Sequence, residues 1–371
     1  MELDLEEIRK QIDVCDHELA DVLQRRLSLV MDVAAYKKYK GIPVKDAARE
    51  KVVIEKVASY VDNPNYKVAV KNIMRSIIDQ ACILEEENIA GVSTKVYEIG
   101  CFGPEGSFTH QALEDFFKEK AYNRHHYNTF DEVIGNISDG SLDYAVLPIE
   151  NSSTGGITEV YDLLRKYDCY IVGEQQVKIE QNLLGLPGTN LDEIRTVYSH
   201  PQGFKQSKEF LKAYPNMEQV PFFSTSRSAE EVALQKDPKI AAIAGRKAAE
   251  LYGLEVLVPA INYNSNNYTR FVIITKKQQI IPKANKITLI VAVKHETGSL
   301  YKMLASFYHT GLNLLNLESR PMDGKSWEYF FYIDLSGNIA DPLVIDVMQE
   351  IEQNCTYCKV LGNYLAFEKK D

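Results

Sequence analysis

A threonine and an arginine stand where a polar loop turns into a β-branched run, and side chains of these types can bind an anion. Thr269 and Arg270 follow two asparagines and a tyrosine and precede the apolar residues 271–274. Such a run predicts a buried strand, so both side chains would be held on rigid backbone at its mouth. α/β proteins present groups to anionic ligands in this way, although two such residues often only end a loop.

Further polar motifs follow short apolar runs in the same part of the chain. They occupy residues 103–109, 148–156, 198–202 and 224–226, and Gln206 lies on the helix expected after the third motif. One hydroxyl cluster usually caps a helix, but a series after successive strands predicts a single ligand site at the carboxyl edge of a sheet. The spacing of Gly100, Gly103 and Gly106 differs from the dinucleotide-binding motif Gly-x-Gly-x-x-Gly, so no nicotinamide cofactor is expected.

Two cations lie on the apolar side of the long helix that the N-terminal residues predict. Apolar residues recur there at helical spacing, with no glycine or proline before Gly41. Arg26 and Lys37 fall beside the apolar stripe, within about 20° of each other, so they require a negative partner. Arg9 points roughly 100° away and would reach a site in a partner subunit. A helix of ~30 residues, about 45 Å long, is too long for its own small domain to cover, which favours packing on a second copy.

Two further helices are predicted to bring acidic and basic residues to the same module. Asp46 is a candidate N-cap, with Arg49 and Glu50 in the first turn of the second helix. The third helix places Ala81 and Glu85 one turn apart on a single face. The plainer interpretation is a helical dimerisation module whose charges are solvated, and spacing alone does not decide between the two.

The composition excludes several classes of function. The 371 residues suffice for about two or three domains, and a net charge of -10 argues against nucleic acid or an anionic membrane as the main partner. No apolar run reaches the roughly 18 residues of a membrane span, and the acidic N-terminus is unlike a targeting signal. A cytoplasmic protein with reduced thiols is therefore expected. Cys355 and Cys358 have no second pair, so no metal is expected there.

Changes of pattern along the chain predict three domains. Residues 1–90 are expected to be all-helical, and a polar linker follows them. Residues 96–278 alternate short apolar runs with helical ones, which predicts a mostly parallel α/β sheet in two lobes. Residues 284–371 follow the order βαββαβ of a ferredoxin-like unit and carry no obvious nucleophile or acid pair.

The charged residues of the helical module resemble the active-site set of the all-helical chorismate mutases, which are intertwined dimers. The residues that carry the resemblance are Arg9, Arg26, Lys37, Asp46, Arg49 and Glu50. It implies that the arginines hold the two carboxylates of chorismate and that the lysine serves the ether oxygen. The acids would serve the ring hydroxyl and the clamp, which is the set of cations that holds the carboxylates. Ala81 and Glu85 stand where that family often has serine and glutamine. A glutamate donates only when protonated, so mutase activity is expected to rise toward acid pH.

The polar motifs of residues 96–278 resemble prephenate dehydratase, whose site lies in a cleft between two α/β lobes. The residues carried over are Glu150, Asn151, Ser199, Gln206, Thr269 and Arg270. The resemblance implies that Thr269 acts at the leaving hydroxyl with support from the asparagine, the serine and the glutamine. Glu150 would orient the site and Arg270 would hold a carboxylate. His200 is a further candidate acid, although a His-Pro pair in a loop is commonly structural. Aromatisation drives the reaction, so no cofactor is expected.

The C-terminal unit resembles an ACT domain, a small-ligand sensor, through two short motifs. They are Gly298, Ser299, Leu300 and Tyr301 at the expected first helix, and Glu318, Ser319, Arg320 and Pro321 after the expected second strand. The second motif is characteristic of phenylalanine-regulated dehydratases, which implies L-phenylalanine as the effector. A helix N-terminus can bind the carboxylate of an amino acid. A site shared between the subunits of a homo-oligomer, a dimer or a tetramer, would couple binding to activity.

The three resemblances together predict an enzyme with two activities and feedback inhibition by phenylalanine. As an isomerase it would convert chorismate to prephenate, and as a lyase it would convert prephenate to phenylpyruvate. Two alternatives stand beside this prediction. A non-catalytic amino-acid sensor would need only the anion clamps, and replacing Thr269 would leave its function intact. A mutase fused to prephenate dehydrogenase would need the dinucleotide motif that residues 100–106 lack.

Overall fold

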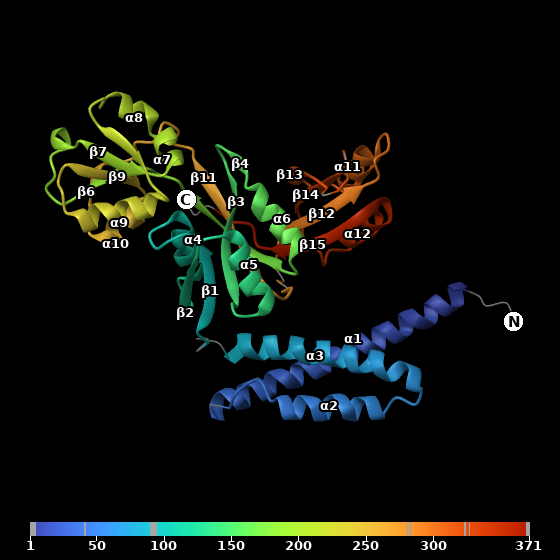
Figure 1. Cartoon of the computed structure of the whole chain (residues 1–371). Coiled ribbons are helices and arrows are strands. Elements are labelled where there is room, and N and C mark those ends of the chain that lie inside the picture. The colour runs from blue at the N-terminus through green and yellow to red at the C-terminus, as the bar shows by residue number, and fades with distance from the viewer. Residues whose placement is uncertain are drawn as a thin grey trace. The chain divides into compact units, whose positions relative to one another are not determined.

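The structure divides into two compact units, Met1–Lys95 and Val96–Asp371 (Figure 1). This computed structural model describes residues 5–40, 42–89, 95–279, 281, 283–322, 324–325 and 327–368. Within these ranges, none of the helices combines the length and the apolar character needed to cross a membrane.

The first unit is helical, as predicted, and its helices are α1 (Leu5–Lys40), α2 (Ala47–Ser59) and α3 (Pro64–Ile89). Asp46 caps α2, because its Oδ1 accepts a hydrogen bond from the Arg49 backbone N–H at 2.9 Å. Helix α3 packs against both α1 and α2. The buried core between the helices is small and consists mainly of Ile54, Met74, Ile78 and Cys82.

Helix α1 keeps much of its apolar surface exposed. Over its 36 residues the exposed fraction is 52% for Ile12, 52% for Leu19, 65% for Leu29 and 45% for Val33. Contiguous exposed apolar residues are typical of surfaces that join another protein. The small core with α2 and α3 therefore accounts for only part of the apolar stripe that the sequence predicts.

The second unit begins with a mixed sheet, here called the first lobe, of strand order β2-β1-β3-β11-β5 with β4 beside β3. Its strands are β1 (Tyr97–Phe102), β2 (Tyr122–Tyr127), β3 (Tyr144–Asn151), β4 (Gly155–Gly156), β5 (Tyr170–Lys178) and β11 (Tyr268–Thr275). Its helices are α4 (Phe108–Phe117), α5 (Phe130–Asp139) and α6 (Thr158–Lys166). Side chains of the helices and strands form a continuous core on both faces of the sheet.

A second sheet, here called the second lobe, has the strand order β10-β6-β9-β7-β8. Its strands are β6 (Asn182–Gly185), β7 (Thr196–Ser199), β8 (Glu218–Pro221), β9 (Ile240–Ala244) and β10 (Glu255–Val258). Its helical segments are η1 (Leu191–Glu193), α7 (Pro201–Gln206), α8 (Lys208–Lys212), α9 (Thr225–Gln235) and α10 (Arg246–Tyr252). The predicted arrangement in two α/β lobes is confirmed.

The prediction of a mostly parallel sheet is right only for part of each lobe. Strand β1 is parallel to β2 and β3, and β7 is parallel to β8 and β9. Strand β11 is antiparallel to both β3 and β5, and β6 is antiparallel to β9 and β10. The cause is the path of the chain, which leaves the first lobe after β5 and comes back to it along β11.

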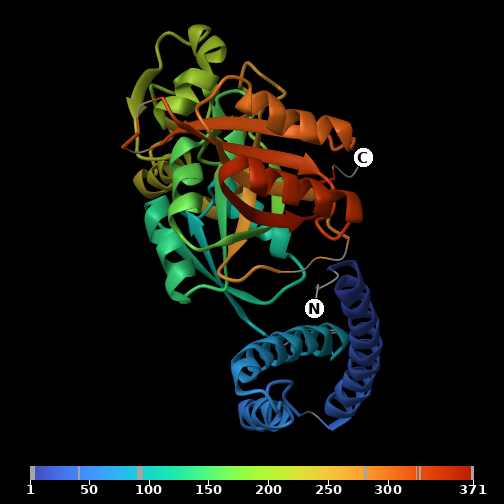
Figure 2. The same cartoon turned by 90° about the vertical axis from the view of Figure 1, so that its right-hand side faces the viewer.

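The C-terminal residues form an antiparallel sheet, here called the C-terminal sheet, of order β13-β14-β12-β15. Its strands are β12 (Lys286–Val293), β13 (Leu314–Pro321), β14 (Tyr329–Ser336) and β15 (Cys355–Tyr364). Helices α11 (Ser299–His309) and α12 (Pro342–Asn354) share one apolar core with the strands and cover one face of the sheet (Figure 2). The predicted order βαββαβ is confirmed.

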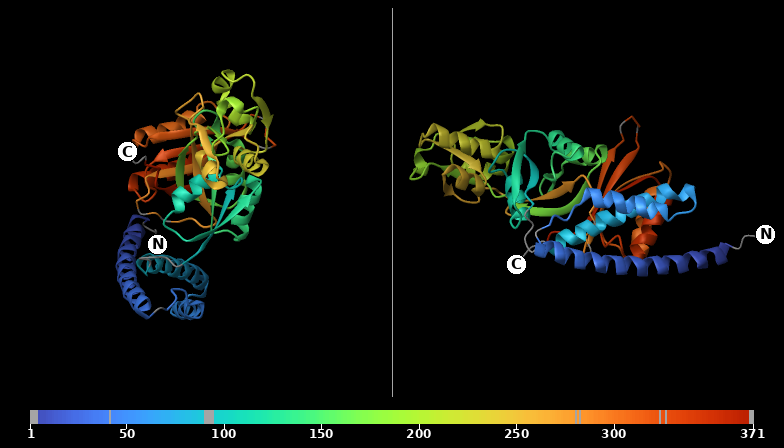
Figure 3. Two further views of the ribbon diagram at one scale, coloured as in Figure 1. Left: turned by 90° about the vertical axis from the view of Figure 1, so that its left-hand side faces the viewer. Right: turned by 90° about the horizontal axis from the view of Figure 1, so that it is seen from below.

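The C-terminal sheet packs directly on the first lobe. Strand β15 lies against β5 so closely that a Cβ atom on Gly362 would come within 2.1 Å of the Ile171 carbonyl oxygen. Tyr332 on β14 donates its hydroxyl hydrogen to the Tyr161 carbonyl oxygen on α6 at 2.7 Å. In the right-hand panel of Figure 3 the first lobe lies between the second lobe and the C-terminal sheet. The first lobe therefore contacts both of its neighbours in the second unit.

Candidate active sites

In the helical unit, a lysine and a glutamate form a partly buried pair. Lys37 Nζ on α1 donates to Glu85 Oε2 on α3 at 2.7 Å and to the Val44 carbonyl oxygen at 2.7 Å. The two side chains are 17% and 8% exposed, and Ala81, one turn before the glutamate, is buried. Burial strengthens such a charge-assisted hydrogen bond. The negative partner that the sequence requires for Lys37 is thus Glu85.

Among the described residues, the other predicted cations of this unit make no ion pair with Glu85. Arg26 is half-buried, and its Nη1 is buried with no hydrogen-bond partner in the described part of the chain. Arg9 and Arg49 are exposed, and Glu50 is half-buried. A buried guanidinium nitrogen without a partner is costly, and an anion would satisfy it. One chain therefore presents an unmatched cation beside an exposed apolar helix face.

A cavity of about 1030 Å³ opens between the first and second lobes. Each of the polar motifs that the sequence singles out contributes to its lining, through Gly103, Asn151, His200, Ser224 and Thr269. Aromatic and aliphatic side chains complete the wall, as is typical of small-molecule sites. The structure thus brings together motifs that are spread over more than half of the second unit.

Asn151 and Thr269 are paired at the centre of this lining. They lie opposite each other on β3 and β11, and Asn151 Nδ2 donates to Thr269 Oγ1 at 2.9 Å. Asn151 Oδ1 accepts hydrogen bonds from the backbone N–H groups of Ser153 and Thr154 at 3.0 and 3.1 Å, which fix the orientation of its amide. Because the Thr269 oxygen accepts from Asn151, its own hydroxyl hydrogen is available to a ligand.

Gln206 and Gln181 form a second polar pair in the lining. Gln181 Nε2 donates to Gln206 Oε1 at 3.0 Å, which leaves the Gln206 amide hydrogens as possible donors to a ligand. Gln181 Oε1 is buried and has no hydrogen-bond partner in the described ranges. The sequence analysis missed Gln181, which lies where the chain passes from the first lobe to the second. Its only signal is a polar run between two apolar segments.

The start of each of three helices borders the cavity. Ser107 caps α4 by accepting from the His110 backbone N–H at 3.2 Å, His200 Nδ1 caps α7 at 3.1 Å, and Ser224 caps α9 at 3.1 Å. Helix N-termini favour anions. Arg227, on the first turn of α9, adds a cation, and a hydrogen bond to Glu230 at 2.5 Å raises the pKa of the arginine.

The structure places Arg270, Glu150 and Ser199 outside the lining of this cavity. Arg270 points to the opposite face of β11, because neighbouring side chains on a strand alternate between the two faces. Burial opposes its charge, but nearby groups, Asp334 foremost, outweigh burial and raise the pKa of the arginine. Ser199 is buried and donates to the Ile243 carbonyl oxygen at 2.9 Å. The geometry therefore revises the carboxylate-holding role predicted for Arg270.

The first predicted effector motif borders a cavity of about 420 Å³ in the C-terminal sheet. Ser299 and Leu300 line it, together with Trp327. Gly298 begins α11 with a φ of 81°, a left-handed conformation that glycine adopts without strain. Tyr301 is 74% exposed and is not part of the lining.

The second predicted effector motif lies elsewhere in the same chain. The sequence analysis expected this motif after a strand. In the structure it forms the end of β13, as Glu318, Ser319, Arg320 and Pro321. Arg320 Nη2 donates to Asp162 Oδ2 on α6 at 2.8 Å, so this motif borders the first lobe. A single chain therefore does not bring the two motifs to one cavity.

Two protein families match this chain. The chorismate mutase type II model matches residues 8–86, and the prephenate dehydratase model matches residues 99–279. A bifunctional chorismate mutase/prephenate dehydratase of Enterobacter agglomerans is 32% identical to this chain over 379 residues. The alignment covers 96% of this chain and 95% of that protein.

Solved structures resemble the second unit. The prephenate dehydratase of Arthrobacter aurescens, in complex with L-Phe, has a TM-score of 0.66 and 30% identity, covering 72% of this chain and 89% of its own. GqqA, described as a novel type of quorum quenching acylase, has a TM-score of 0.66 and 28% identity, covering 73% of this chain and 98% of its own.

The full-length match decides between the alternatives that the sequence analysis left open. It confirms the prediction of an enzyme with two activities. The alternative of a fused dehydrogenase is wrong, because residues 99–279 match the prephenate dehydratase model. The chain belongs to the family of bifunctional chorismate mutase/prephenate dehydratases of phenylalanine biosynthesis and has both of those activities.

Proposed function

We propose that the reactions and their regulation are divided among three domains of a cytoplasmic enzyme. Residues 1–90 rearrange chorismate, residues 96–278 dehydrate prephenate, and residues 284–371 respond to L-phenylalanine. The matches to family models at residues 8–86 and 99–279 support the first two assignments. The complex of the Arthrobacter aurescens relative with L-Phe supports the third.

In the mutase reaction, Lys37 serves the ether oxygen of chorismate. The substrate is a dianion that must fold into a compact chair, and negative charge moves onto the ether oxygen as the C–O bond breaks. Fixed cations accelerate such a step by holding the reactive conformer and stabilising the new charge. Glu85 and the Val44 carbonyl oxygen hold the lysine at 2.7 Å each, which supports this role. No metal or cofactor takes part.

The mutase site is completed by a second copy of the chain. Arg26 and Arg49 bind the carboxylates of chorismate, Asp46 and Glu50 serve the ring hydroxyl and the clamp, and Arg9 reaches the site of the partner subunit. The buried and unmatched Nη1 of Arg26 and the exposed apolar face of α1 support this arrangement. Burial of that face against a second copy would also supply the core that the helical unit lacks.

In the dehydratase reaction, Thr269 donates a hydrogen bond to the hydroxyl that leaves prephenate. The hydroxyl departs as water, the ring carboxylate departs as carbon dioxide, and the released electron pair completes the aromatic ring. The hydrogen bond from Asn151 to Thr269 Oγ1 is the observation that carries this assignment, because it turns the threonine hydrogen toward the ligand. A threonine is a weak acid, so it acts as a donor or proton relay.

Gln206 assists from the second lobe, and the capped helix starts at Ser107 and Ser224 hold the carboxylate that stays on the product. Helix N-termini suit this task because they stabilise an anion without a mobile countercharge. Gln206 belongs to the cavity lining, with its amide hydrogens not used by Gln181. Closing the two lobes around prephenate would remove water from the departing groups.

L-phenylalanine inhibits the dehydratase by binding to the C-terminal domain. The N-terminus of α11 at Gly298 takes the carboxylate of the effector, and the cavity beside Ser299 and Leu300 takes its side chain. Glu318 to Pro321 complete the site from another subunit of the homo-oligomer. Within one chain the first motif borders that cavity and the second borders the first lobe, which supports a shared site.

Purified protein supplied with chorismate tests these proposals in one experiment. Prephenate should appear first and phenylpyruvate second, and added L-phenylalanine should slow only the second step. Absence of phenylpyruvate would contradict the dehydratase assignment, and equal rates with and without L-phenylalanine would contradict the effector assignment. Analysis of the oligomeric state in the same samples reports on the proposed dimer or tetramer.

A further inference from the structure

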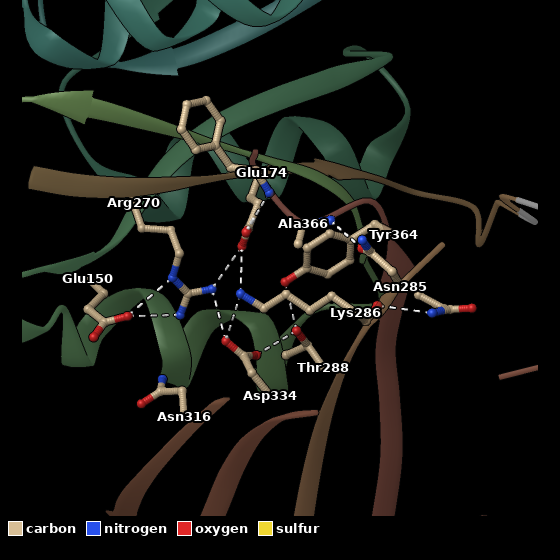
Figure 4. Close-up of polar contacts among 12 residues, drawn as sticks. Glu150, Glu174, Arg270, Asn285, Lys286, Thr288, Asn316, Asp334, Tyr364 and Ala366 are labelled. Atoms are coloured by element: carbon tan, nitrogen blue, oxygen red, sulfur yellow. Dashed lines mark hydrogen bonds and ion pairs between the residues drawn. The ribbon is translucent and has the colours of Figure 1, made fainter. Parts of the chain in front are cut away.

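A buried cluster of charged side chains lies behind the Asn151–Thr269 pair, on the other face of the same strands. It joins the first lobe to the C-terminal sheet (Figure 4). The first lobe contributes Glu150, Glu174 and Arg270, and the C-terminal sheet contributes Lys286 and Asp334. None of these five side chains lines the prephenate cavity, and none has a role in the mechanism above.

Four members of the cluster form a closed ring in which cations and carboxylates alternate. Arg270 Nη1 lies 3.3 Å from Glu174 Oε2 and 3.0 Å from Asp334 Oδ2. Lys286 Nζ lies 2.8 and 3.4 Å from the same two oxygens. Each carboxylate oxygen is thus shared by two cations. Each domain supplies one cation and one carboxylate, so the ring is complete only when the domains are docked as they are here.

The ring is buried and its members are held by further hydrogen bonds. The exposed fractions of the Arg270, Glu174, Lys286 and Asp334 side chains are 9%, 2%, 8% and 5%. Thr288 Oγ1 donates to Asp334 Oδ1 at 2.7 Å. Buried charges that lose one partner become strongly unfavourable, so they tolerate little displacement. A ring of this kind fixes the relative positions of the elements that carry it.

Arg270 connects the ring to the catalytic pair through the register of two strands. Glu150 and Arg270 are opposite each other on β3 and β11, one step from the opposed Asn151 and Thr269. Arg270 Nε and Nη2 donate to Glu150 Oε2 at 3.2 and 3.0 Å. The strand register shifts directly after Arg270, so this contact lies at a bulge. Bulges re-aim nearby side chains, and the arginine holds the two strands together at that point.

We propose that Arg270 and Glu150 are positioning residues of the dehydratase, and that Lys286 and Asp334 of the C-terminal sheet hold them in place. The C-terminal domain then supports the dehydratase site directly, even without an effector. The inference rests on the proposed role of Thr269 as donor. Its physical basis is that a shift of about 1 Å in a catalytic group can lower a rate on the order of 100-fold.

Neutralising either C-terminal member of the ring tests this proposal. Asp334→Asn and Lys286→Met keep side-chain size and remove one charge each. In the full-length protein, each should lower the dehydratase kcat by about 10-fold or more, with the KM for prephenate changed by less than about 3-fold. Circular dichroism and thermal unfolding of the same sample report that the second unit is folded, and mutase activity reports on the helical unit. Mutase activity should stay at the wild-type level, because the helical unit is a separate compact unit.

Asp162→Asn is the matched control. It removes the carboxylate of another ion pair between the first lobe and the C-terminal sheet, 2.8 Å from Arg320 Nη2, on α6 and outside the ring on β3 and β11. The Arg320 side chain is 24% exposed and that of Asp162 is 40% exposed, and ion pairs open to solvent contribute little to stability. Its dehydratase kcat should remain within about 2-fold of wild type. An equal loss in this control would contradict the proposal, because any weakening of domain contact would then suffice.

Combining Asp334→Asn with Thr269→Ala separates positioning from general destabilisation. If the ring acts by placing the threonine hydroxyl, its loss should lower kcat little in a protein without that hydroxyl, so the two effects should not add. Full additivity would overturn the proposal. Thr269→Ala with wild-type kcat would instead contradict the proposed function of Thr269. Those two failures are therefore distinguishable.

Thr288→Val provides a second route if a charge-removing variant does not fold. It removes the hydrogen bonds that Thr288 Oγ1 makes with Asp334 Oδ1 and with the Tyr364 hydroxyl, and it leaves every charge of the ring in place. The dehydratase kcat should fall by about 3-fold with unchanged KM, since a hydrogen bond from an uncharged donor holds Asp334 less strongly than the cations of the ring do. A folded Thr288→Val protein with wild-type kcat would contradict the requirement for a fixed ring.

Discussion

The two catalytic units of this enzyme differ in how much of a site one chain completes. In the second unit, Asn151 and Thr269 are hydrogen-bonded at the lining of a cavity that both lobes build. In the helical unit, Lys37 has its partner in Glu85, but Arg26 keeps a buried nitrogen without one in the described residues. The difference supports the proposal that one chain suffices for dehydration and that rearrangement needs two.

The contrast follows from how each unit builds its core. The second unit buries most of its apolar residues between sheets and helices, so its strands hold side chains to fixed positions. The helical unit has a small core of its own and leaves the apolar face of a 36-residue helix exposed. The proposed mutase site on this helix would be completed when a second copy covers that face.

The largest expected effect is the loss of the dehydratase hydroxyl. Thr269→Ala should lower the dehydratase kcat by about 10² to 10⁴-fold, which is the usual contribution of a positioned proton donor. Thr269→Ser should keep most of the activity. Thr275→Val, on the same strand, removes a hydroxyl that donates to the Asp143 carbonyl oxygen and serves as control. Steady-state rates of phenylpyruvate formation measure these effects. Equal losses in Thr269→Ala and Thr275→Val would contradict the role assigned to Thr269.

A charge on the exposed face of α1 should separate the two activities. Leu19→Glu places an unpaired carboxylate where the second copy is expected to pack, and mutase activity should fall by about 10-fold or more. Dehydratase activity should remain. Val68→Glu changes a residue of α3 that is 69% exposed and should leave both rates unchanged. Retention of mutase activity in the Leu19→Glu protein would argue for a site within one chain.

A smaller effect is expected at Glu85. A glutamate beside the ether oxygen can donate only when protonated, so wild-type mutase activity should rise as the pH falls. Glu85→Gln should donate at every pH and show a profile flatter than that of wild type. Mutase rates between acid and neutral pH give the comparison, with the dehydratase rate of the same samples as reference. If the pH profiles of wild type and Glu85→Gln coincide, the predicted role of Glu85 as a donor is wrong.

The smallest expected effect is on the folding stability of the second unit at acid pH. Burial lowers the pKa of His110 from 6.5 to about 4. Between these values the unfolded chain binds protons more readily than the folded one, so stability present above pH 6.5 is lost as the pH falls through 4. His110→Asn, which can still accept from the Gly106 N–H, should weaken this dependence for the second unit.

Thermal unfolding at neutral and mildly acid pH measures that difference. An unchanged pH dependence in the His110→Asn protein would mean that other groups dominate the acid response of the first lobe.

Local patterns in the sequence were sufficient for much of the fold. Helical spacing predicted α1, the residue type at a helix start predicted the cap Asp46, and the succession of patterns predicted the element order βαββαβ of the C-terminal residues. Strand β2 was missed because it lies at a sheet edge and consists largely of polar residues. The antiparallel course of β11 was also missed, since no local pattern reports which neighbour a strand pairs with.

The sequence predicted which motifs form the candidate site, but not the face of the sheet to which each side chain points. Alternation along a strand would have separated Thr269 from Arg270 and Asn151 from Glu150, yet the sequence analysis assigned all of them to one ligand. The partners of Arg270 could not be inferred at all. Asp334 and Lys286 lie on the C-terminal sheet, and their contacts depend on how that sheet docks on the first lobe.

Mixing two inactive mutases tests most directly whether rearrangement needs two chains. Arg9→Ala and Lys37→Met each remove one contribution to a site, and in a mixed dimer one of the two sites regains both residues. After subunit exchange, half of the dimers are mixed, so mutase activity should recover to about a quarter of wild type. Dehydratase activity should stay constant throughout. Recovery to that level supports a site shared between chains, and a mixture as inactive as its components would contradict it.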